Sequence, residues 1–257
     1  TTTATLAAGQ VATAWANGLL SGSGAQAFKV TPTIDAQASG VARIRILHGA
    51  PDAPSVDVFI DQLKVVSNVA FGQLSSYLPV NAGTFRVQIR AAGAATVVFE
   101  TSITTGAGKD YTIAAIGLID PQGAAIAAGE FTLVAFEDMN GSAPAGQAKL
   151  RVIHLSPNAP TIDVRAGTAV LFDDLTYPNA SDRYQTVAPG AVEARVTTAD
   201  GQQTLLATPL TLAPGSVSTV FALGLAGDSV PENQRLRALA VTDTPSIARI
   251  FVPILSR

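Results

Sequence analysis

The sequence has 257 residues, of which 47% are hydrophobic and only 14% are charged, and its formal net charge is −3. An ordinary soluble domain carries about 25% charged residues, so the composition predicts that more surface is buried than one monomer can bury. The Lys and Arg residues are scattered, which excludes a phosphate-binding face and a nucleic-acid partner. No apolar run reaches the length of about 18 residues that a transmembrane helix needs.

The chain contains no cysteine, and its single methionine is Met139. Disulfides therefore add nothing to its stability, which must come from packing and from assembly. Since the first residue, Thr1, is not an initiator methionine, we expect a product from which a secretory signal peptide has been removed, with another kind of trimming as the alternative. The expected location is extracellular, at the cell surface.

Residues 1–40 form a predicted N-terminal extension of low charge that lies outside the repeats described below. Val11, Trp15 and Leu19 are spaced by four, which suits an amphipathic helix. Val11, Thr13 and Trp15 are spaced by two, which suits a strand. The sequence leaves both structures open for residues 1–20.

The second part of this extension, AFKVTPTIDA, has an extended character and contains Phe28 and Val30. Pro32 lacks a backbone donor and limits any role as a central strand. A long extension of this kind could pair with the sheet of another subunit, so we interpret residues 1–40 as a candidate donor strand or assembly arm.

The chain contains two copies of one unit. ARIRILHGAPDAPSVDVFID, from Ala42, returns as AKLRVIHLSPNAPTIDVRAG, from Ala148. Later matches, such as Tyr77 with Tyr184, follow after one small insertion in a loop, as expected for a duplicated folded unit. The predicted organisation is module 1 over residues 41–139, a linker over 140–147, module 2 over 148–244 and a C-terminal strand over 245–257.

Both modules show strand patterns. Arg43, Arg45 and Leu47 alternate with Ile44 and Ile46, which predicts a strand with one buried face. Further short runs follow at spacings of about 8–12 residues, separated by Gly, Pro, Asn and Asp, which is typical of antiparallel sandwiches. The predicted fold is all-β, with two tandem antiparallel β-sandwich domains of the Ig-like, Greek-key type and an N-terminal extension.

The repeated motif H-x-x-P-[DN]-A-P-x-[VI]-D-V raises the question of a metal or catalytic site. His48, Asp52 and Asp57 could be read as metal ligands, but module 2 replaces Asp52 by Asn158. His154, Ser156 and Asp163 are the residue types of a nucleophilic triad, but module 1 has no matching serine. We favour a structural turn and predict no enzyme and no cofactor or metal. The residues of this turn motif are His48, Pro51, Pro54, Asp57, His154, Pro157, Pro160 and Asp163.

The last segment, IARIFVPILSR, contains Ile250 and Val252 and begins like module 1. An unclaimed strand of this kind needs a sheet edge. It could close module 2 of its own chain, or it could pair with another subunit.

The two copies of ARIRILHGAPDAPSVDVFIDQ and AKLRVIHLSPNAPTIDVRAG, each followed by a later IGL or LGL, resemble the tandem modules of the domain-of-unknown-function family 4397 (DUF4397). The resemblance covers roughly residues 41–244. It implies a secreted or cell-surface β-sandwich, and it implies no catalytic residue because the family has no established activity.

These patterns favour an extracellular structural subunit that self-assembles into a pilus-like surface filament or into a layer by donating a terminal strand to a neighbour. The predicted partner is a second copy of the chain. The alternative is a secreted adhesion module that binds wall polysaccharide or a surface protein through its loops. The residues that we expect in assembly are Val11, Trp15, Leu19, Phe28, Val30, Ile250 and Val252.

Overall fold

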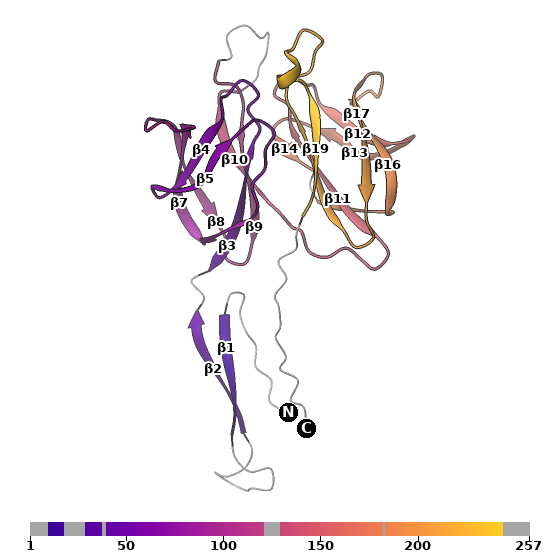
Figure 1. The fold of residues 1–257 in the computed structure, drawn as a ribbon. Helices are drawn as coiled ribbons and strands as arrows, with labels where there is room; N and C mark the ends of the chain where they lie inside the picture. The colour runs from indigo at the N-terminus through magenta and orange to yellow at the C-terminus, as the bar shows by residue number, and fades with distance from the viewer. Residues whose placement is uncertain (1–9, 18–28, 38–39, 121–128, 182, 244–257) are drawn as a thin grey trace.

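The structure, a computed structural model, describes residues 10–17, 29–37, 40–120, 129–181 and 183–243. Figure 1 shows two strand-rich modules side by side and a separate hairpin beyond one end of module 1. Within the described residues, the helical structure is a short 3-10 helix, η2 (Glu232–Gln234). None of these residues belongs to a helix long and apolar enough to cross a membrane.

Module 1 is a sandwich of two four-stranded sheets. The outer sheet has the order β5-β4-β7-β8 and the inner sheet has the order β10-β9-β3-β6. Between them lies a core of aliphatic and aromatic side chains that includes Ile44, Val58 and Ile113. The strands of module 1 are β3 (Val41–His48), β4 (Val56–Ile60), β5 (Leu63–Val69), β6 (Leu78–Asn81), β7 (Gly83–Ala91), β8 (Val97–Thr105), β9 (Asp110–Ile116) and β10 (Thr132–Glu137).

Module 2 repeats this arrangement. Its outer sheet has the order β13-β12-β16-β17, and its inner sheet has the order β14-β11-β18-β19 with β15 also paired to β11. Its core contains Leu150, Ile162 and Val220, the counterparts of the module 1 core. The strands of module 2 are β11 (Ala148–Leu155), β12 (Ile162–Ala166), β13 (Ala169–Leu175), β14 (Asn179–Ala180), β15 (Gln185–Val187), β16 (Gly190–Thr198), β17 (Thr204–Leu212), β18 (Val217–Leu223) and β19 (Arg237–Thr242).

The predicted all-β sandwich fold is confirmed, with one refinement. Each inner sheet contains a parallel pair, β3 with β9 in module 1 and β11 with β18 in module 2, while its other pairs are antiparallel. The first strand of each module therefore lies in the middle of the inner sheet. This position explains why its sequence is repeated so closely.

The inner strands differ from the predicted pattern of one buried face. The alternate positions Arg45 and Leu47 of β3 are 3% and 0% exposed, although they face away from the core of module 1. The same holds in module 2, where every residue of β18 is buried. The cause is the packing of the two modules. Their inner sheets lie against each other, so each sheet buries the second face of the other.

The glycine of the repeated AIGL and ALGL runs has a backbone function. Gly117 and Gly224 have φ angles of +84° and +98°, in the region that disfavours any side chain. A Cβ atom at Gly117 would lie 2.5 Å from the carbonyl oxygen of Glu130, and one at Gly224 would collide with the carbonyl of Arg235. Glycine is therefore required where the chain leaves the parallel strand of each module.

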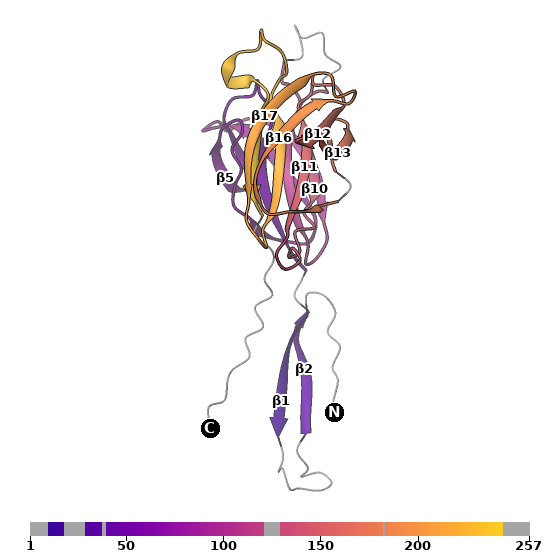
Figure 2. The ribbon, with the colours of Figure 1, turned by 90° about the vertical axis from the view of Figure 1, so that its right-hand side faces the viewer.

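The N-terminal extension forms a hairpin of two antiparallel strands, β1 (Gln10–Asn17) and β2 (Lys29–Gln37). For residues 10–17 the open choice between helix and strand is thus decided in favour of a strand. Among the described strands, β1 and β2 pair only with each other. Figures 1 and 2 show from two sides that the hairpin extends away from both modules.

Candidate functional site

A buried histidine closes the loop that follows the first strand of each module. His48 is fully buried, and its Nε2 lies 3.0 Å from the carbonyl oxygen of Pro54. His154 is also fully buried, with its Nε2 3.2 Å from the carbonyl oxygen of Pro160. Because a carbonyl can only accept a hydrogen bond, Nε2 carries the proton in both rings. The prolines of the motif, Pro51, Pro54, Pro157 and Pro160, lie in these two loops.

The residue after the first proline of this loop, an aspartate in module 1 and an asparagine in module 2, fixes the loop by hydrogen bonds. Asp52 accepts hydrogen bonds from the backbone N–H groups of Ile119 and Asp120, at 3.1 and 2.9 Å. Its counterpart Asn158 accepts a hydrogen bond from the N–H of Ala226 and donates one to its carbonyl. Both loops are thereby tied to the segment that follows the parallel strand of the inner sheet.

The aspartate that the motif repeats in both modules supports a strained turn in the outer sheet. Asp57 accepts hydrogen bonds from Lys64 Nζ at 2.6 Å and from the backbone N–H of Asn68 at 2.9 Å. Lys64 and the backbone donors lower the pKa of Asp57 to about 2. Asp163 accepts a hydrogen bond from the N–H of Asp174 at 3.1 Å. Asn68 and Asp174 both have positive φ angles, so each aspartate holds an unfavourable backbone conformation in place.

The buried histidines predict a pH dependence of stability. Burial lowers the pKa of His48 and of His154 below their ordinary value. The unfolded chain then takes up protons below about pH 6.5 that the folded chain does not, so stability is complete above that pH and falls as the pH is lowered further. We expect the free energy of unfolding in urea to fall between about pH 6.5 and 5.

Replacing both rings by glutamine, in a His48→Gln, His154→Gln chain, should flatten that slope. The separate loss at lower pH should remain, because the pKa of Asp57 and that of Asp200 are lowered in the folded chain. A slope between these pH values that is identical in the double variant would contradict the assignment.

The residue types of a catalytic triad are not brought together. His154 Nδ1 accepts the backbone N–H of Ser156 at 3.3 Å, while Ser156 Oγ donates to Asn158 Oδ1 at 3.5 Å. Asp163 lies on β12, in the outer sheet, where it accepts from Arg165 and from the backbone N–H of Asp174. Over the described part of the chain, no group of three or more His, Cys, Asp or Glu residues is placed to hold a metal ion.

The two modules meet in a continuous apolar cluster. Module 1 contributes Leu47, Ala114, Ile116 and Phe136, and module 2 contributes Ile153, Leu155, Phe221 and Leu223, all of them buried. These side chains come from the inner strands β3, β9, β10, β11 and β18. An interface with such an apolar core resembles a domain core more than a contact between independently moving domains.

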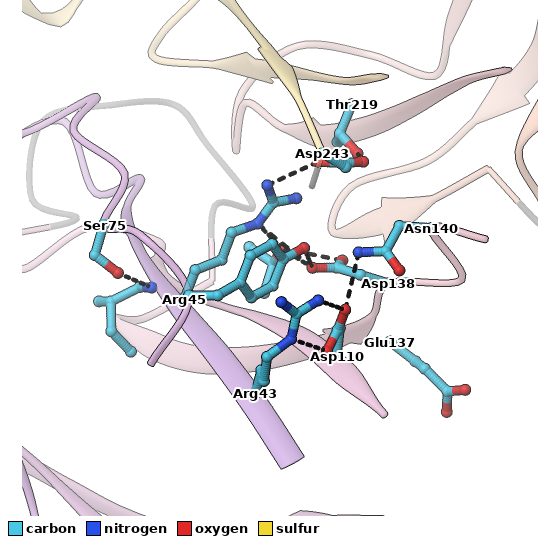
Figure 3. Close-up of polar contacts among 12 residues, drawn as sticks. Arg43, Arg45, Ser75, Asp110, Glu137, Asp138, Asn140, Thr219 and Asp243 are labelled. Atoms are coloured by element: carbon cyan, nitrogen blue, oxygen red, sulfur yellow. Dashed lines mark hydrogen bonds and ion pairs between the residues drawn. The ribbon is translucent and has the colours of Figure 1, made fainter. Parts of the chain in front are cut away.

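A network of buried charges crosses this interface (Figure 3). Arg45 of module 1 forms an ion pair with Asp243 of module 2, with its Nη1 2.7 Å from the carboxylate oxygen. In the reverse direction, Arg151 of module 2 pairs with Asp138 of module 1. The four side chains are at most 3% exposed. Each arginine thus pairs with the aspartate of the other module, and the Nε of Arg45 also lies 3.4 Å from the carboxylate of Asp138 in its own module.

Each aspartate is also held by its own module. Asp138 accepts hydrogen bonds from Tyr77 Oη at 2.6 Å and from Thr112 Oγ1 at 2.8 Å. Asp243 accepts them from Tyr184 Oη at 2.8 Å and from Thr219 Oγ1 at 2.7 Å. An arginine, an aspartate, a tyrosine and a threonine therefore occur in the half of the network that each module contributes.

The guanidinium of Arg45 keeps its charge although it is buried. Burial lowers the pKa of Arg45, but the carboxylates of Asp138 and Asp243 outweigh it and leave the pKa above its ordinary value. The guanidinium also lies 4.8 Å from the centre of the Tyr77 ring. Burial raises the pKa of Tyr77, so its hydroxyl stays protonated and donates to Asp138.

The start of the linker is anchored to module 1. Asn140 is 6% exposed, and its Nδ2 donates to Asp110 Oδ2 at 3.0 Å. Asp110 also pairs with Arg43 (Figure 3). On the other side, Lys149 Nζ of β11 donates to the carbonyl of Gly141. These contacts, with the interface, fix the relative position of the modules.

This network is not among the sites that we predict from the sequence. The signal was present, because Arg45 and Arg151 recur at the same place in the repeat and Tyr77 and Tyr184 are also matched. Arg43 and Lys149 recur in the same way but are only half-buried, so the repetition marks matched charges without showing which of them are buried. Only the packing of the two inner sheets shows which carboxylate is the partner.

Surface hollows lie on both modules. In module 1, an apolar groove of about 340 Å³ opens beside β8 and includes Val98, Phe99 and Phe131. A second groove of about 490 Å³, near the start of β3, includes Leu63 and Val80. In module 2, a polar hollow of about 390 Å³ is lined by Asp173, Asp174, Leu175, Thr176, Asn179, Ser181, Arg183 and Gln185 among others.

The residues expected in assembly are only partly described. Val11 and Trp15 lie in β1, and Val30 lies in β2, where it pairs with Ala16. Trp15 pairs with Thr31 in the same hairpin. The remaining residues of the set lie outside the described residues, namely Leu19, Phe28, Ile250 and Val252.

Comparisons agree with the duplicated architecture. The family model described as "Domain of unknown function (DUF4397)" matches residues 42–165 and 152–249. No curated protein matches the chain. Among solved structures, the chain is similar to a carbohydrate-binding module of family CBM26 from Eubacterium rectale Amy13K, crystallised with maltoheptaose. The likeness has 8% identity and a TM-score of 0.23, and covers 76% of this chain and all of that one. It is too low to carry an argument about ligands.

Proposed function

Because the chain belongs to the DUF4397 family and carries two of its modules in tandem, we propose that it is a non-catalytic structural subunit of the cell surface. Copies of the chain assemble into an extracellular filament or layer. Each copy joins the next by adding its terminal strands to the edge of a neighbouring sheet.

The observation that carries this proposal is the hairpin of β1 and β2. A two-stranded hairpin is at best marginally stable in water, and three or more strands or a packed face are needed for independent stability. Among the described strands, this hairpin pairs with neither module. A sheet edge on another copy supplies the missing strand pairing, and this accounts for the extension in front of the first module.

The coupled modules suit a structural role. Apolar packing and two crossed ion pairs hold the inner sheets together, so the two sandwiches form one rigid body. A rigid body transmits force between neighbours, whereas a flexible linker would dissipate it. The low content of charged residues is consistent with surface that is covered by other subunits.

The test is electron microscopy in negative stain of the full chain and of a chain that lacks residues 1–40. We expect filaments or sheets from the full chain and dispersed, folded particles from the truncated one. Circular dichroism and light scattering confirm that the truncated chain is folded and monomeric. Polymers that persist after the truncation would contradict assembly through the N-terminal hairpin.

The polar hollow of module 2 favours a second function, that of an adhesion module. Its exposed carboxylates, amides and the Arg183 guanidinium offer the hydrogen-bonding groups that sugar hydroxyls require. A monomeric chain that binds a glycan array, and loses that binding on Asp173→Ala substitution, would support this function. If the array shows no bound glycan and the microscope shows filaments, the adhesion function is refuted and the structural-subunit function stands.

A further inference from the structure

The edge of β8 differs from the edges that β17, β6 and β5 form in the sheets of the two modules. β8 is the last strand of the order β5-β4-β7-β8, so one of its sides has no neighbour among the described strands. It is nine residues long, contains no proline, and carries one charged residue, Glu100. Such an edge presents a row of unpaired backbone groups to which another strand can add.

The comparable edges carry features that block strand addition. β17, the counterpart of β8 in module 2, is also nine residues long, but Pro209 removes one of its backbone donors. β6 has only four residues and includes Pro79. β5 pairs with β4 through two register shifts and contains Lys64. Proline, bulges and lysine are the devices that protect natural edge strands from pairing with other chains.

An apolar groove accompanies the unblocked edge. It lies between β8 and the segment before β10, where the rings of Phe99 and Phe131 stack edge to face at 5.3 Å. Val98 and Ile119, which line it, are 57% and 51% exposed. Large apolar side chains exposed next to each other at a free edge indicate a surface that another chain covers.

The hairpin and the groove lie at opposite ends of module 1. β2 ends at Gln37, shortly before β3 begins at Val41, whereas Ile119 follows β9, which runs parallel to β3. The groove is therefore at the end of β3 that lies away from the hairpin. A contact between opposite ends of two copies is head to tail, and it extends into an open filament wherever the rotation between successive copies does not close a ring.

The hairpin fits this acceptor in length and charge. β1 and β2 have eight and nine residues, and β1 contains no charged residue. Lys29, which pairs with Asn17, marks the end of the hairpin farthest from module 1. Glu130 lines the groove and Glu100 lies on β8. The acceptor therefore carries acidic groups that can pair with Lys29 at the far end of the hairpin.

We propose that the free edge of β8, with the apolar groove beside it, receives the β1–β2 hairpin of a second copy of this chain. The proposal rests on the proposed function and names its acceptor site. Backbone hydrogen bonds to β8 supply the affinity, and apolar side chains of the donated hairpin fill the groove. Repetition of this contact along the chain of copies produces a filament.

The first experiment uses the absence of native cysteine. One copy carries Thr13→Cys in β1, and a second copy, distinguished by a mass tag, carries Val98→Cys beside the groove. After mixing under assembly conditions and mild oxidation, we expect disulfide-linked pairs of the two copies. The matched control carries Leu63→Cys, which is 71% exposed in the other groove of module 1. Crosslinks to position 63 and none to position 98 would overturn the proposal.

The second experiment separates this inference from the proposed function. Val98→Asp places a charge at the edge and should abolish filaments in the microscope, while Val170→Asp, at a 44% exposed site of module 2, should leave them intact. Filaments that persist in Val98→Asp would refute β8 as the acceptor and leave the structural subunit standing. An unaltered chain that forms no filaments under any condition would refute both.

Discussion

Removing the carboxylate of Asp138 should cost about 3–5 kcal/mol of the free energy of unfolding, the range measured when one partner of a buried ion pair is deleted. Asp138 accepts hydrogen bonds from Arg151, Tyr77 and Thr112, and lies 3.4 Å from Arg45 Nε. An Asp138→Ala chain leaves these donors buried in an apolar interface. Arg151 loses its carboxylate partner altogether, and this is the largest part of the cost.

The measurement is urea unfolding followed by circular dichroism, with Glu137→Ala as the matched control. Glu137 is the preceding residue, and its side chain makes an exposed ion pair with Lys109. Its backbone carbonyl, which accepts from Arg151, is unaffected by Glu137→Ala, so the substitution should change stability by less than about 1 kcal/mol. The related substitution Asp243→Ala should reproduce the loss, because Asp243 holds the same place in module 2. Equal, small effects of Asp138→Ala and Glu137→Ala would show that the network contributes little.

Truncating Phe221 to alanine should lower the free energy of unfolding by about 3–5 kcal/mol and weaken the noncovalent association of the two modules. Phe221 is fully buried in the cluster that joins the two inner sheets. Its ring also lies 5.8 Å from the guanidinium of Arg45, across the interface. The cavity left by the substitution would lie between the modules, where neither core can relax into it.

A protease site placed in the exposed linker segment 142–145 reports this coupling directly. After cleavage, the two halves of the otherwise unaltered chain should elute together in size-exclusion chromatography, and the halves of Phe221→Ala should separate. Phe85→Ala, a substitution of the same size inside the core of module 1, should lower stability while the halves remain together. Separation of the unaltered halves would contradict a rigid pair of modules.

Several properties followed from the sequence alone because they depend on local periodicity and on repetition. The alternation in ARIRI and in its copy at AKLRV indicated strands, and the repeat indicated two equivalent folded units. The turn motif around His48 and Asp57 could be located in the same way. The family resemblance rests on these motifs, and the family model that matches residues 42–165 and 152–249 confirms it.

The tertiary structure alone decided what the second face of the inner strands does. Alternation distinguishes two faces of a strand but does not say whether water or another sheet covers the polar one. Arg45 and Arg151 read as solvent-facing residues until the opposing sheets brought Asp243 and Asp138, distant in sequence, within reach. Likewise, β8 and β17 are both nine-residue strands with similar burial. Only their position at the edge of a sheet shows that Pro209 removes a backbone donor to which another strand could pair. Charge pairing and edge exposure depend on which distant segments come into contact in the folded chain. A local sequence pattern does not contain that information.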